Sequence, residues 1–362
     1  MARKYDGPSP EEVLTNDLIA LLESADTPKW RRPWTPGSSQ FHRNFITGTE
    51  YHGQNPILLT VGQLLRDHPL PLWCGATQAK EKGWHPAKGS KSTRILRPQL
   101  NKFEKKDDDG KPVLGPDGEP VIGAWTSYKV VPVFNIGDLV GFNDEATAAL
   151  EAIKAEANGV SADKVPAQRL ELAERQLESW EVETRFGGAV ACYSPGADRI
   201  AMPLRESFET VDGYCATWLH EQAHSTGHSS RLNRKDGMGA KHGSRAYAYE
   251  ELVAELASVL GCYRLQVGCE ITQHAAYLAS WIGLLKEGPK VLLRVLADAR
   301  KAADLIAPEG GDEHGDESPR AEAEAVVPKG GRTDQRRGSR QDGPSGDSSE
   351  GLVLAGTAEA RP

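Results

Sequence analysis

The sequence predicts an α+β protein: a small N-terminal α+β domain, then a mostly helical C-terminal domain and a disordered C-terminal tail. A chain of 362 residues is long enough for about two to three domains. Strand-like and helical patterns alternate up to residue 142, whereas helical patterns dominate from there to residue 306. The remainder is rich in Gly, Ser and charged residues and has few large apolar ones, which is typical of disorder. We therefore divide the chain into four parts. They are an N-terminal domain (residues 8–142), a helical connector (143–186), a C-terminal domain (187–306) and a tail (307–362).

Composition excludes several classes of protein. Apolar residues make up 38% of the chain and charged residues 26%, which is typical of globular domains. No apolar run approaches the roughly 18–20 residues that a membrane span needs, so we expect no membrane partner. The N-terminal segment MARKYDGPSPEEV lacks the apolar stretch of a secretory signal. Five cysteines without a CxxC pair favour reduced thiols, and we expect a cytoplasmic protein.

The N-terminal region combines one clear helix with strand-like segments. PEEVLTNDLIALLES carries apolar residues at helical spacing behind Ser9 and Pro10, which predicts a helix over residues 10–24. The turn signatures DG and PDG predict a loop or loose hairpin over 105–121. AWTSYKVVPVFNI, residues 124–136, is rich in β-forming residues and predicts a strand that returns to the sheet.

The rest of the chain is mostly helical. Two charged stretches, DEATAALEAIKAEAN and AQRLELAERQLESWEVETRF, predict the helices of the connector. The segments AVACY and DRIAMP then predict a short strand pair. After this pair the pattern predicts four helices, over residues 210–226, 246–265, 272–285 and 289–306.

Charge is distributed unevenly along the chain. The formal net charge is −8, yet residues 29–106 carry 14 Lys and Arg against four Asp and Glu. Such a cluster attracts a polyanion whatever the overall charge. Aromatic residues are interleaved with these basic residues: Trp30, Trp34, Phe41, Phe45, Tyr51, Trp73 and Trp84. We expect about half of these aromatic residues to lie in the core. Aromatic faces stack on unpaired bases while Lys and Arg follow the phosphates, so this region predicts binding to single-stranded DNA.

The run His220-Glu221-Gln222-Ala223-His224 predicts a metal site. Positions i and i+4 of a helix lie one above the other, so both imidazoles point at one spot. Two neutral imidazoles suit Zn²⁺, and a glutamate beside the first one can act as general base on an attacking water. The apolar residues before the motif place it on a mostly buried helix, where unpaired histidines would be costly.

A third protein ligand should come from the helix AYAYEELVAELASVLG. Glu251 and Glu255 lie one turn apart on this otherwise apolar helix, and buried carboxylates need partners. We expect Glu251 to bind the metal and Glu255 to orient a histidine, with Glu250 as the alternative ligand. Tyr247, Tyr249 or His228 would donate to an oxyanion. We also expect the strand DRIAMP to form an edge that binds an extended peptide.

These segments resemble a known family. TWLHEQAHSTGHSSRLNR, YAYEELVAELASVLG and the stretch from HAAYLASW to KAADLI resemble the zincin-like metallopeptidase domain of ArdC-type antirestriction proteins, which plasmids and phages carry. The 27 positions from His224 to Glu251 are similar to the spacing in gluzincin-like peptidases. KWRRPW, RNFITGTEYHGQN, WCGATQAKEKGWHPAKGSKST and VFNIGDLVG look like the single-stranded-DNA-binding domain of ArdC, shared with some plasmid primases. The chain departs from that pattern at Gly75, at Asp138 and in a long acidic insertion over 104–121.

The resemblance implies a protein that binds single-stranded DNA, holds Zn²⁺ on His220, His224 and Glu251, and protects mobile DNA from host restriction. A protein substrate or a host restriction component would be a further partner. The candidate DNA contacts are Trp30, Arg32, Trp34, Arg43, Asn44, Tyr51, Asn55, Gln78, Lys82, Lys88 and Lys91. Two alternatives stay open: a non-enzymatic DNA-binding shield whose metal is structural, and a primase-related replication accessory protein.

Overall fold

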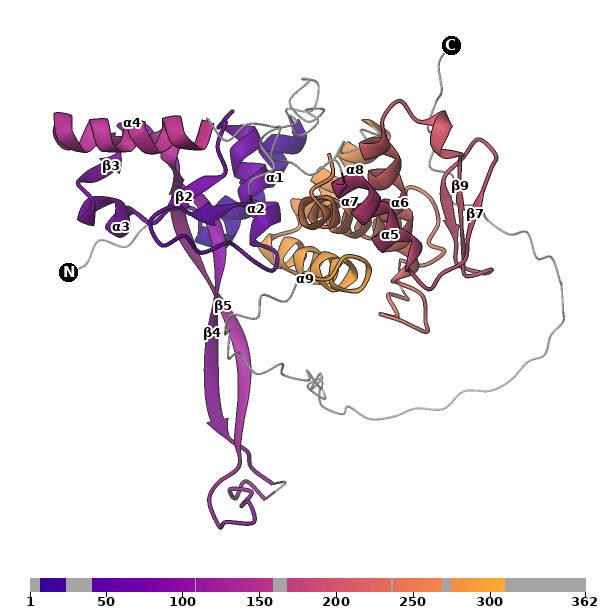
Figure 1. Cartoon of the computed structure of the whole chain (residues 1–362). Coiled ribbons are helices and arrows are strands. Elements are labelled where there is room, and N and C mark those ends of the chain that lie inside the picture. Colours follow the sequence, from indigo (N-terminus) through magenta and orange to yellow (C-terminus); the bar gives the residue numbers. More distant parts are fainter. Residues whose placement is uncertain are drawn as a thin grey trace, which may run out of the picture. The chain divides into compact units, whose positions relative to one another are not determined.

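The computed structural model describes residues 7–23, 41–107, 109–158, 168–235, 237–268 and 275–309 (Figure 1). They form two compact units, one running to Arg97 and resuming at Lys129, the other spanning Pro98–Tyr128. The mixture of helices and small sheets confirms the predicted α+β class. KWRRPW and the tail beyond residue 309 lie outside the described residues. No helix among the described residues is long and apolar enough to cross a membrane.

The first helix, α1 (Pro10–Glu23), confirms the prediction for residues 10–24. Its start is a reciprocal capping box: the Glu12 N–H donates to Ser9 Oγ at 3.2 Å, and the Ser9 N–H donates to Glu12 Oε2 at 2.6 Å. Leu14, Leu18 and Leu22 follow at intervals of four residues and are all buried. The cap fixes where the helix begins, and this apolar stripe attaches it to the core.

A four-stranded sheet follows, with β1 (Arg43–Asn44), β2 (Leu72–Cys74), β5 (Ile122–Asn135) and β4 (Thr93–Glu104) in that spatial order. β1 runs parallel to β2, with Arg43 opposite Leu72. β2 runs antiparallel to β5, with Trp73 opposite Asn135. The strand predicted over 124–136 is therefore β5. α2 (Asn55–Leu65) lies between β1 and β2 in the sequence, and its first residue holds β4 through both the N–H and the C=O of Leu96.

A second, smaller core surrounds two short strands. β3 (Trp84–Pro86) pairs with β6 (Leu139–Gly141), the latter following the 3₁₀ turn η3 (Ile136–Asp138). α3 (Ala76–Glu81) and α4 (Asp144–Asn158) complete it. The Trp84 indole N–H donates to the carbonyl of Ala146 at 2.8 Å, and Leu150 is buried beside it. The first predicted connector helix, α4, is thus part of the packing around Trp84.

Helix α5 (Arg169–Glu178) ends earlier than the sequence predicts. The prediction of helix through residue 186 is wrong, because residues Thr184–Phe186 form strand β7 and pair with β9 (Arg199–Met202). Trp180 turns the chain, its indole N–H donating to Ser225 Oγ at 2.9 Å. Pairing with a distant strand therefore overrides the local helical pattern.

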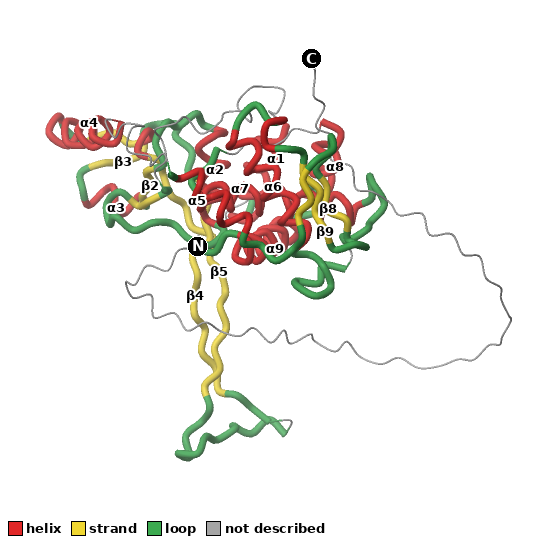
Figure 2. The backbone as a smooth tube through the Cα atoms, turned by 45° about the vertical axis from the view of Figure 1, so that its right-hand side comes forward, coloured by secondary structure: helices red, strands yellow, loops and turns green. Residues whose placement is uncertain are grey.

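The strand pair predicted from AVACY and DRIAMP is present, but its arrangement corrects one expectation. β8 (Cys192–Ser194) pairs antiparallel with β9, and the two lie side by side in Figure 2. The spatial order of the sheet is β7-β9-β8. DRIAMP therefore forms the central strand and is not an edge, because β7 takes up its second side. The edge strand from this pair is β8.

The helices predicted for the C-terminal region are all present in their described parts. A 3₁₀ turn, η5 (Arg205–Ser207), precedes them, and they are α6 (Val211–Ser225), α7 (Arg245–Leu265), α8 (Ala275–Leu285) and α9 (Pro289–Ile306). α7 packs against both α6 and α9, which explains why it is apolar on nearly every side.

A buried histidine joins the N-terminal region to α7. The Trp73 indole N–H donates to His42 Nδ1 at 3.0 Å, so the neutral ring carries its proton on Nε2 and donates it to Thr60 Oγ1 at 3.0 Å. Burial lowers the pKa of His42 to about 3 and keeps the ring neutral. The ring stacks on Tyr263 of α7 with centroids 5.5 Å apart, and the His42 backbone N–H donates to the Tyr263 hydroxyl at 2.6 Å.

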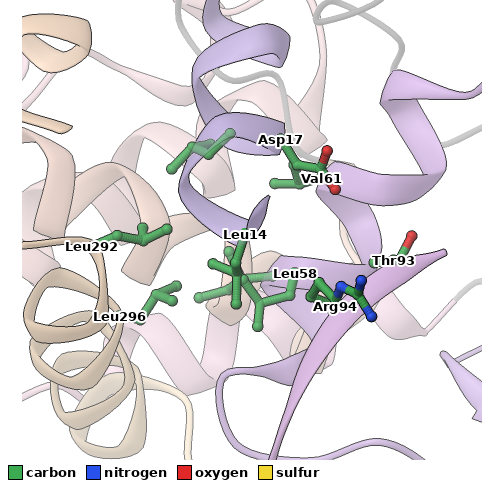
Figure 3. Close-up of a pocket in the computed structure, with 10 residues that line it drawn as sticks. Leu14, Asp17, Leu58, Val61, Thr93, Arg94, Leu292 and Leu296 are labelled. Atoms are coloured by element: carbon green, nitrogen blue, oxygen red, sulfur yellow. The ribbon is translucent and has the colours of Figure 1, made fainter. Parts of the chain in front are cut away.

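One hydrophobic core runs from α1 and α2 to α6, α7 and α9. Where α1, α2 and α9 meet, Leu14, Leu58, Leu292 and Leu296 point toward one another (Figure 3). The space left between these side chains is about 10 Å³, which holds at most one water. Residues of α1, α2 and α9, which are far apart in the sequence, therefore share one closely packed interior.

Shortening Leu296 should destabilise the whole of this core. The side chain is fully buried against residues of α1 and α2, so Leu296→Ala removes contacts and leaves a cavity. We expect the free energy of unfolding to fall by about 2–5 kcal/mol, measured by urea denaturation followed by circular dichroism.

Leu305→Ala is the matched control, since Leu305 lies on the same helix but is 42% exposed. Its effect should stay within about 0.5 kcal/mol. Equal losses for the two variants would contradict the assignment of this core.

Candidate metal centre

Helix α6 presents the HEQAH motif toward α7. Thr210 caps the helix, its Oγ1 accepting from the Gly213 N–H at 3.0 Å, and Trp218 and Leu219 anchor the opposite side in the core. His220 and His224 then fall one above the other, as the spacing predicts. Their rings meet edge to face with centroids 4.7 Å apart, and their Nε2 atoms lie 3.1 Å from each other.

Glu251 of α7 completes a group of three side chains that could ligate a metal ion. Its Oε2 lies 3.8 Å from His220 Nε2, and its Oε1 lies 3.6 Å from His224 Nε2. One ligand atom from each of the three residues lies within 4.8 Å of the other two. Tetrahedral zinc with bonds of about 2.0–2.1 Å separates its ligand atoms by roughly 3.4 Å, so this set fits a metal with small adjustments.

Two further glutamates of α7 face the other nitrogen of each ring. Glu255 Oε2 lies 3.2 Å from His220 Nδ1, and Glu250 Oε1 lies 3.4 Å from His224 Nδ1. A carboxylate at Nδ1 keeps the proton on that atom and directs Nε2 toward a metal. Glu255 therefore lies where an orienting residue is needed. Glu250, the alternative ligand, faces Nδ1 of His224, whereas Glu251 faces Nε2 on the other side of the same ring.

Arg234 holds Glu250 in place. Its guanidinium donates to both carboxylate oxygens, at 2.9 and 2.6 Å, and also to Thr226 Oγ1 and to the carbonyl of Ala223, both at 2.8 Å. Burial opposes ionisation of Glu250, but Arg234 and His224 hold its pKa below the ordinary value. The loop after α6 thus supplies the charge that keeps this glutamate ionised.

Glu221 lies beside the histidines and is buried. Burial raises the pKa of its carboxyl, opposed by His220, His224 and the backbone N–H of Tyr193, which donates to it. Tyr193 belongs to β8, so the edge strand of the small sheet meets the metal centre at this glutamate. A carboxylate with a raised pKa next to a metal site is suited to exchange a proton with water.

The charge of the cluster itself favours a cation. Burial disfavours protonation of His220, yet Glu255, Glu221 and Glu251 together raise the pKa of His220 to about 9. Four glutamates are buried around the two histidines, and Arg234 contacts one of them as a permanent cation. Buried carboxylates require such compensation, and a divalent ion on the two Nε2 atoms and Glu251 would provide it.

An ion-pair network ties the turn between β8 and β9 to the end of α6. The Arg231 guanidinium contacts both oxygens of Asp198, with one contact at 3.1 Å, and donates to the carbonyl of Ser225 at 2.8 Å. Tyr193 donates its hydroxyl to Asp198 at 2.7 Å. His228 Nδ1 lies 2.8 Å from Ser230 Oγ and 3.7 Å from Asp198 Oδ2. The sequence alone gave no sign of Asp198 or Arg231, because they meet only in the folded chain.

The two tyrosines considered for an oxyanion differ in their surroundings. Tyr249 donates its hydroxyl to Asp298 Oδ2 at 2.8 Å, so it is engaged elsewhere. Tyr247 is buried and its ring packs on His242 with centroids 4.9 Å apart.

Several candidate DNA contacts serve the fold of the N-terminal region. Asn44 donates to Gln78 Oε1 at 2.9 Å, and this oxygen also accepts from the Gly75 N–H. Asn55 is occupied by the backbone of Leu96, and Tyr51 is half-buried against the core that contains Trp73. Burial raises the pKa of Tyr51 to about 12.

The basic candidates for DNA contacts that the structure describes, unlike the polar ones, are exposed. Four basic side chains are exposed and available to phosphate: Arg43, Lys82, Lys88 and Lys91. Gly89 adopts a φ of 92°, so the turn between Lys88 and Lys91 needs a glycine. Trp73 and Trp84 are buried, so these two aromatic residues of the interleaved set belong to the core. Trp30, Arg32 and Trp34 lie outside the described residues.

Comparisons with known protein families agree with this geometry. A family model described as a zincin-like metallopeptidase matches residues 171–298. A second, described as the N-terminal domain of anti-restriction factor ArdC, matches residues 9–134. The fold and the site therefore define a zincin-like domain that follows an ArdC-type N-terminal domain.

Individual relatives extend the match over most of the chain. An uncharacterised protein of Sinorhizobium fredii, y4eC, is 33% identical over 299 residues, covering 82% of this chain and 90% of that one. Two proteins of Escherichia coli named DNA primase TraC are 35% and 34% identical, each covering 82% of this chain. The chain spans only 27% and 20% of the length of these two proteins.

Solved structures complete the comparison. The metal-free crystal structure of the antirestriction ArdC protein from plasmid R388 is 28% identical, with a TM-score of 0.54, and covers 82% of this chain and 96% of that one. Its Mn(II)-bound structure is 26% identical, with a TM-score of 0.53. The chain belongs to the ArdC family of antirestriction proteins.

The three glutamates of α7 should differ in their effect on metal binding. Glu251→Gln should abolish tight binding of a divalent metal, because it removes a ligand oxygen. Glu250→Gln and Glu255→Gln should weaken metal affinity by about 10–100-fold, because these carboxylates face the Nδ1 atoms of the histidines and would only orient the rings. Isothermal titration of the purified, metal-stripped protein with Mn²⁺ and with Zn²⁺ measures both effects.

Glu206→Gln serves as control, since Glu206 is exposed in η5, and it should bind metal like the wild type. Loss of binding in Glu250→Gln with wild-type binding in Glu251→Gln would make Glu250 the third ligand.

Proposed function

We propose that this protein is a single-stranded-DNA-binding antirestriction protein whose C-terminal domain is a zinc-dependent peptidase-like hydrolase. The observation that carries the hydrolase proposal is the convergence of His220, His224 and Glu251 with the buried Glu221 beside them. Three protein ligands leave one position of a tetrahedral metal open, which is typical of catalytic rather than structural zinc. The role in evading restriction is proposed from the family, and the cytoplasm is where such a role would be exercised.

The residues of the proposed metal site have different roles in the proposed hydrolysis. His220, His224 and Glu251 would hold Zn²⁺, which when bound lowers the pKa of a water and polarises a carbonyl. Glu221 would take a proton from the attacking water and later pass it to the leaving group. Glu255 and Glu250 would orient the two imidazoles.

Substrate alignment is proposed for β8. As an edge strand it offers backbone hydrogen-bonding groups to an extended peptide, and its Tyr193 already contacts Glu221. His228, placed by Ser230 and Asp198, is our first choice as donor to an oxyanion, with Tyr247 as the second. A protein substrate, such as a component of a host restriction system, fits this arrangement.

The DNA-binding proposal rests on the N-terminal region. Its exposed basic side chains include Arg43, Lys82, Lys88 and Lys91, and the match to the ArdC N-terminal domain covers all of them. We assign no priming activity to this chain, because the matches cover only 27% and 20% of the length of the two proteins named primase.

Replacing the proposed base should separate catalysis from metal binding. Glu221→Gln keeps the size of the side chain but cannot accept a proton, so hydrolysis should fall by about 10²–10⁴-fold. Protection of incoming DNA, measured as transformation of a restricting host, should fall with it. Metal content, measured by elemental analysis, should stay near that of the wild type.

Two comparisons sharpen this experiment. The double variant His220→Ala plus His224→Ala should lose both the metal and protection, whereas Glu206→Gln should lose neither. Full protection by Glu221→Gln together with its loss in the double variant would mean a structural metal and a DNA-binding shield.

The chain of residues 1–362 should prefer single-stranded DNA to duplex of the same length and sequence. Its affinity, measured by fluorescence anisotropy, should fall steeply between 50 and about 200 mM salt, because phosphate contacts release counterions. Lys88→Ala should weaken binding and reduce the salt dependence, with Lys235→Ala as a lysine control from the C-terminal domain. Equal affinity for both forms of DNA would refute the preference for unpaired bases.

A further inference from the structure

Residues 98–128 form a compact unit of their own, which we call the arm. The outer parts of β4 and β5, residues 98–106 and 121–128, run alongside each other as its shaft (Figures 1 and 2). Residues 107–120 connect them as its loop. The Lys105 N–H donates to the carbonyl of Val121 at 2.8 Å, which fixes the register where the shaft ends.

The shaft exposes an unusual number of large apolar side chains. Trp125 is 55% exposed and Phe103 is 47% exposed; the others are Leu100, Ile122 and Tyr128. A two-stranded hairpin is marginally stable in water, and exposed apolar patches mark binding surfaces. The exposed apolar side chains of the shaft therefore indicate that it binds a ligand.

Phe103 and Trp125 lie on the same face of the shaft. Asn101 donates to Ser127 Oγ at 2.8 Å across the two strands, and side chains alternate, so Asn101, Phe103, Trp125 and Ser127 share this face. The Phe103 ring lies over Gly123, where an added Cβ would come within 2.6 Å of the ring. Gly123 thus leaves room for the ring to rest against the backbone of the neighbouring strand, while almost half of the Phe103 surface stays exposed to solvent.

Charge differs sharply between the two parts of the arm. The shaft carries Lys102, Lys105 and Lys106 against one acidic residue, Glu104. The loop carries five acidic residues against Lys111 alone. A polyanion is therefore attracted to the shaft and repelled by the loop.

We propose that the shaft of the arm is a stacking platform for single-stranded DNA, on which unpaired bases pack against Phe103 and Trp125 while Lys105, which alternation places on the same face, contacts phosphate. This inference rests on the proposed function and assigns DNA contacts outside the basic candidates already named. Flat aromatic faces beside basic side chains are the combination that binds unpaired bases. Duplex DNA hides its base faces, and a second copy of the shaft would bring like charges together.

The test uses the chain of residues 1–362 and a fluorescent 30-nucleotide oligo(dT). Phe103→Leu and Trp125→Leu keep an apolar side chain in the strand but remove the flat ring. Each should weaken binding by about fivefold or more in fluorescence anisotropy, and Trp125→Phe should retain most of the affinity. Lys105→Ala should lower the slope of the salt dependence by about one, which corresponds to the loss of one phosphate contact.

Phe186→Leu is the matched control, because Phe186 is a comparably exposed aromatic residue on β7 of the C-terminal domain. It should bind like the wild type. Unchanged circular dichroism and melting temperature in the leucine variants exclude unfolding as the cause of a weaker affinity.

The outcomes separate this inference from the proposed function. Wild-type affinity in both Phe103→Leu and Trp125→Leu overturns the stacking platform, while binding of oligo(dT) by the wild type keeps the proposed function. Failure of the wild type itself to bind oligo(dT) overturns both. A change of oligomeric state in the leucine variants, measured by light scattering, without a change in DNA affinity would make a second copy of the chain the occupant and overturn the inference.

Discussion

Burial of carboxylates on α7 against the histidines of α6 is the constraint on which the C-terminal domain depends. Glu250 and Glu251 are adjacent, so their side chains leave the helix about 100° apart and approach His224 from two sides. Glu255 lies one turn beyond Glu251 and meets His220 on the corresponding side. Three acids in six positions can be buried there because each faces a different nitrogen or a shared metal position.

Close contact between the two helices makes this geometry possible. Ser258 donates to the carbonyl of Ala216 at 3.0 Å, and a side chain on Gly261 would come within 2.9 Å of Leu219. Small residues thus let α7 approach α6 at the turns that follow Glu251 and Glu255. Arg234, from the loop after α6, adds a fixed positive charge that contacts Glu250. The positions of the candidate ligands therefore depend both on the close spacing of α6 and α7 and on the charge of Arg234.

The N-terminal region uses much of its aromatic content for its own stability. Trp73 and Trp84 are buried, and the neutral ring of His42 connects Trp73 to Tyr263 of α7. On the arm, by contrast, Phe103 and Trp125 have no core to enter and about half of each side chain is exposed to solvent. The same residue type thus serves packing in one part of the chain and recognition, as we propose, in another.

Local pattern was enough to predict the α+β class, helix α1 with its Ser9 cap, the helices from α6 onward and the HEQAH motif, since helical spacing and capping act within a few residues. It also placed Glu251 and Glu255 on a buried helix. Tertiary structure alone decided that Glu250 faces Nδ1 of His224, that Arg231 meets Asp198, that residues Thr184–Phe186 pair as a strand and that DRIAMP is central in its sheet. Each of these outcomes depends on a partner far away in the sequence. A periodic pattern shows which side of an element is apolar, but it does not show which distant element will cover that side.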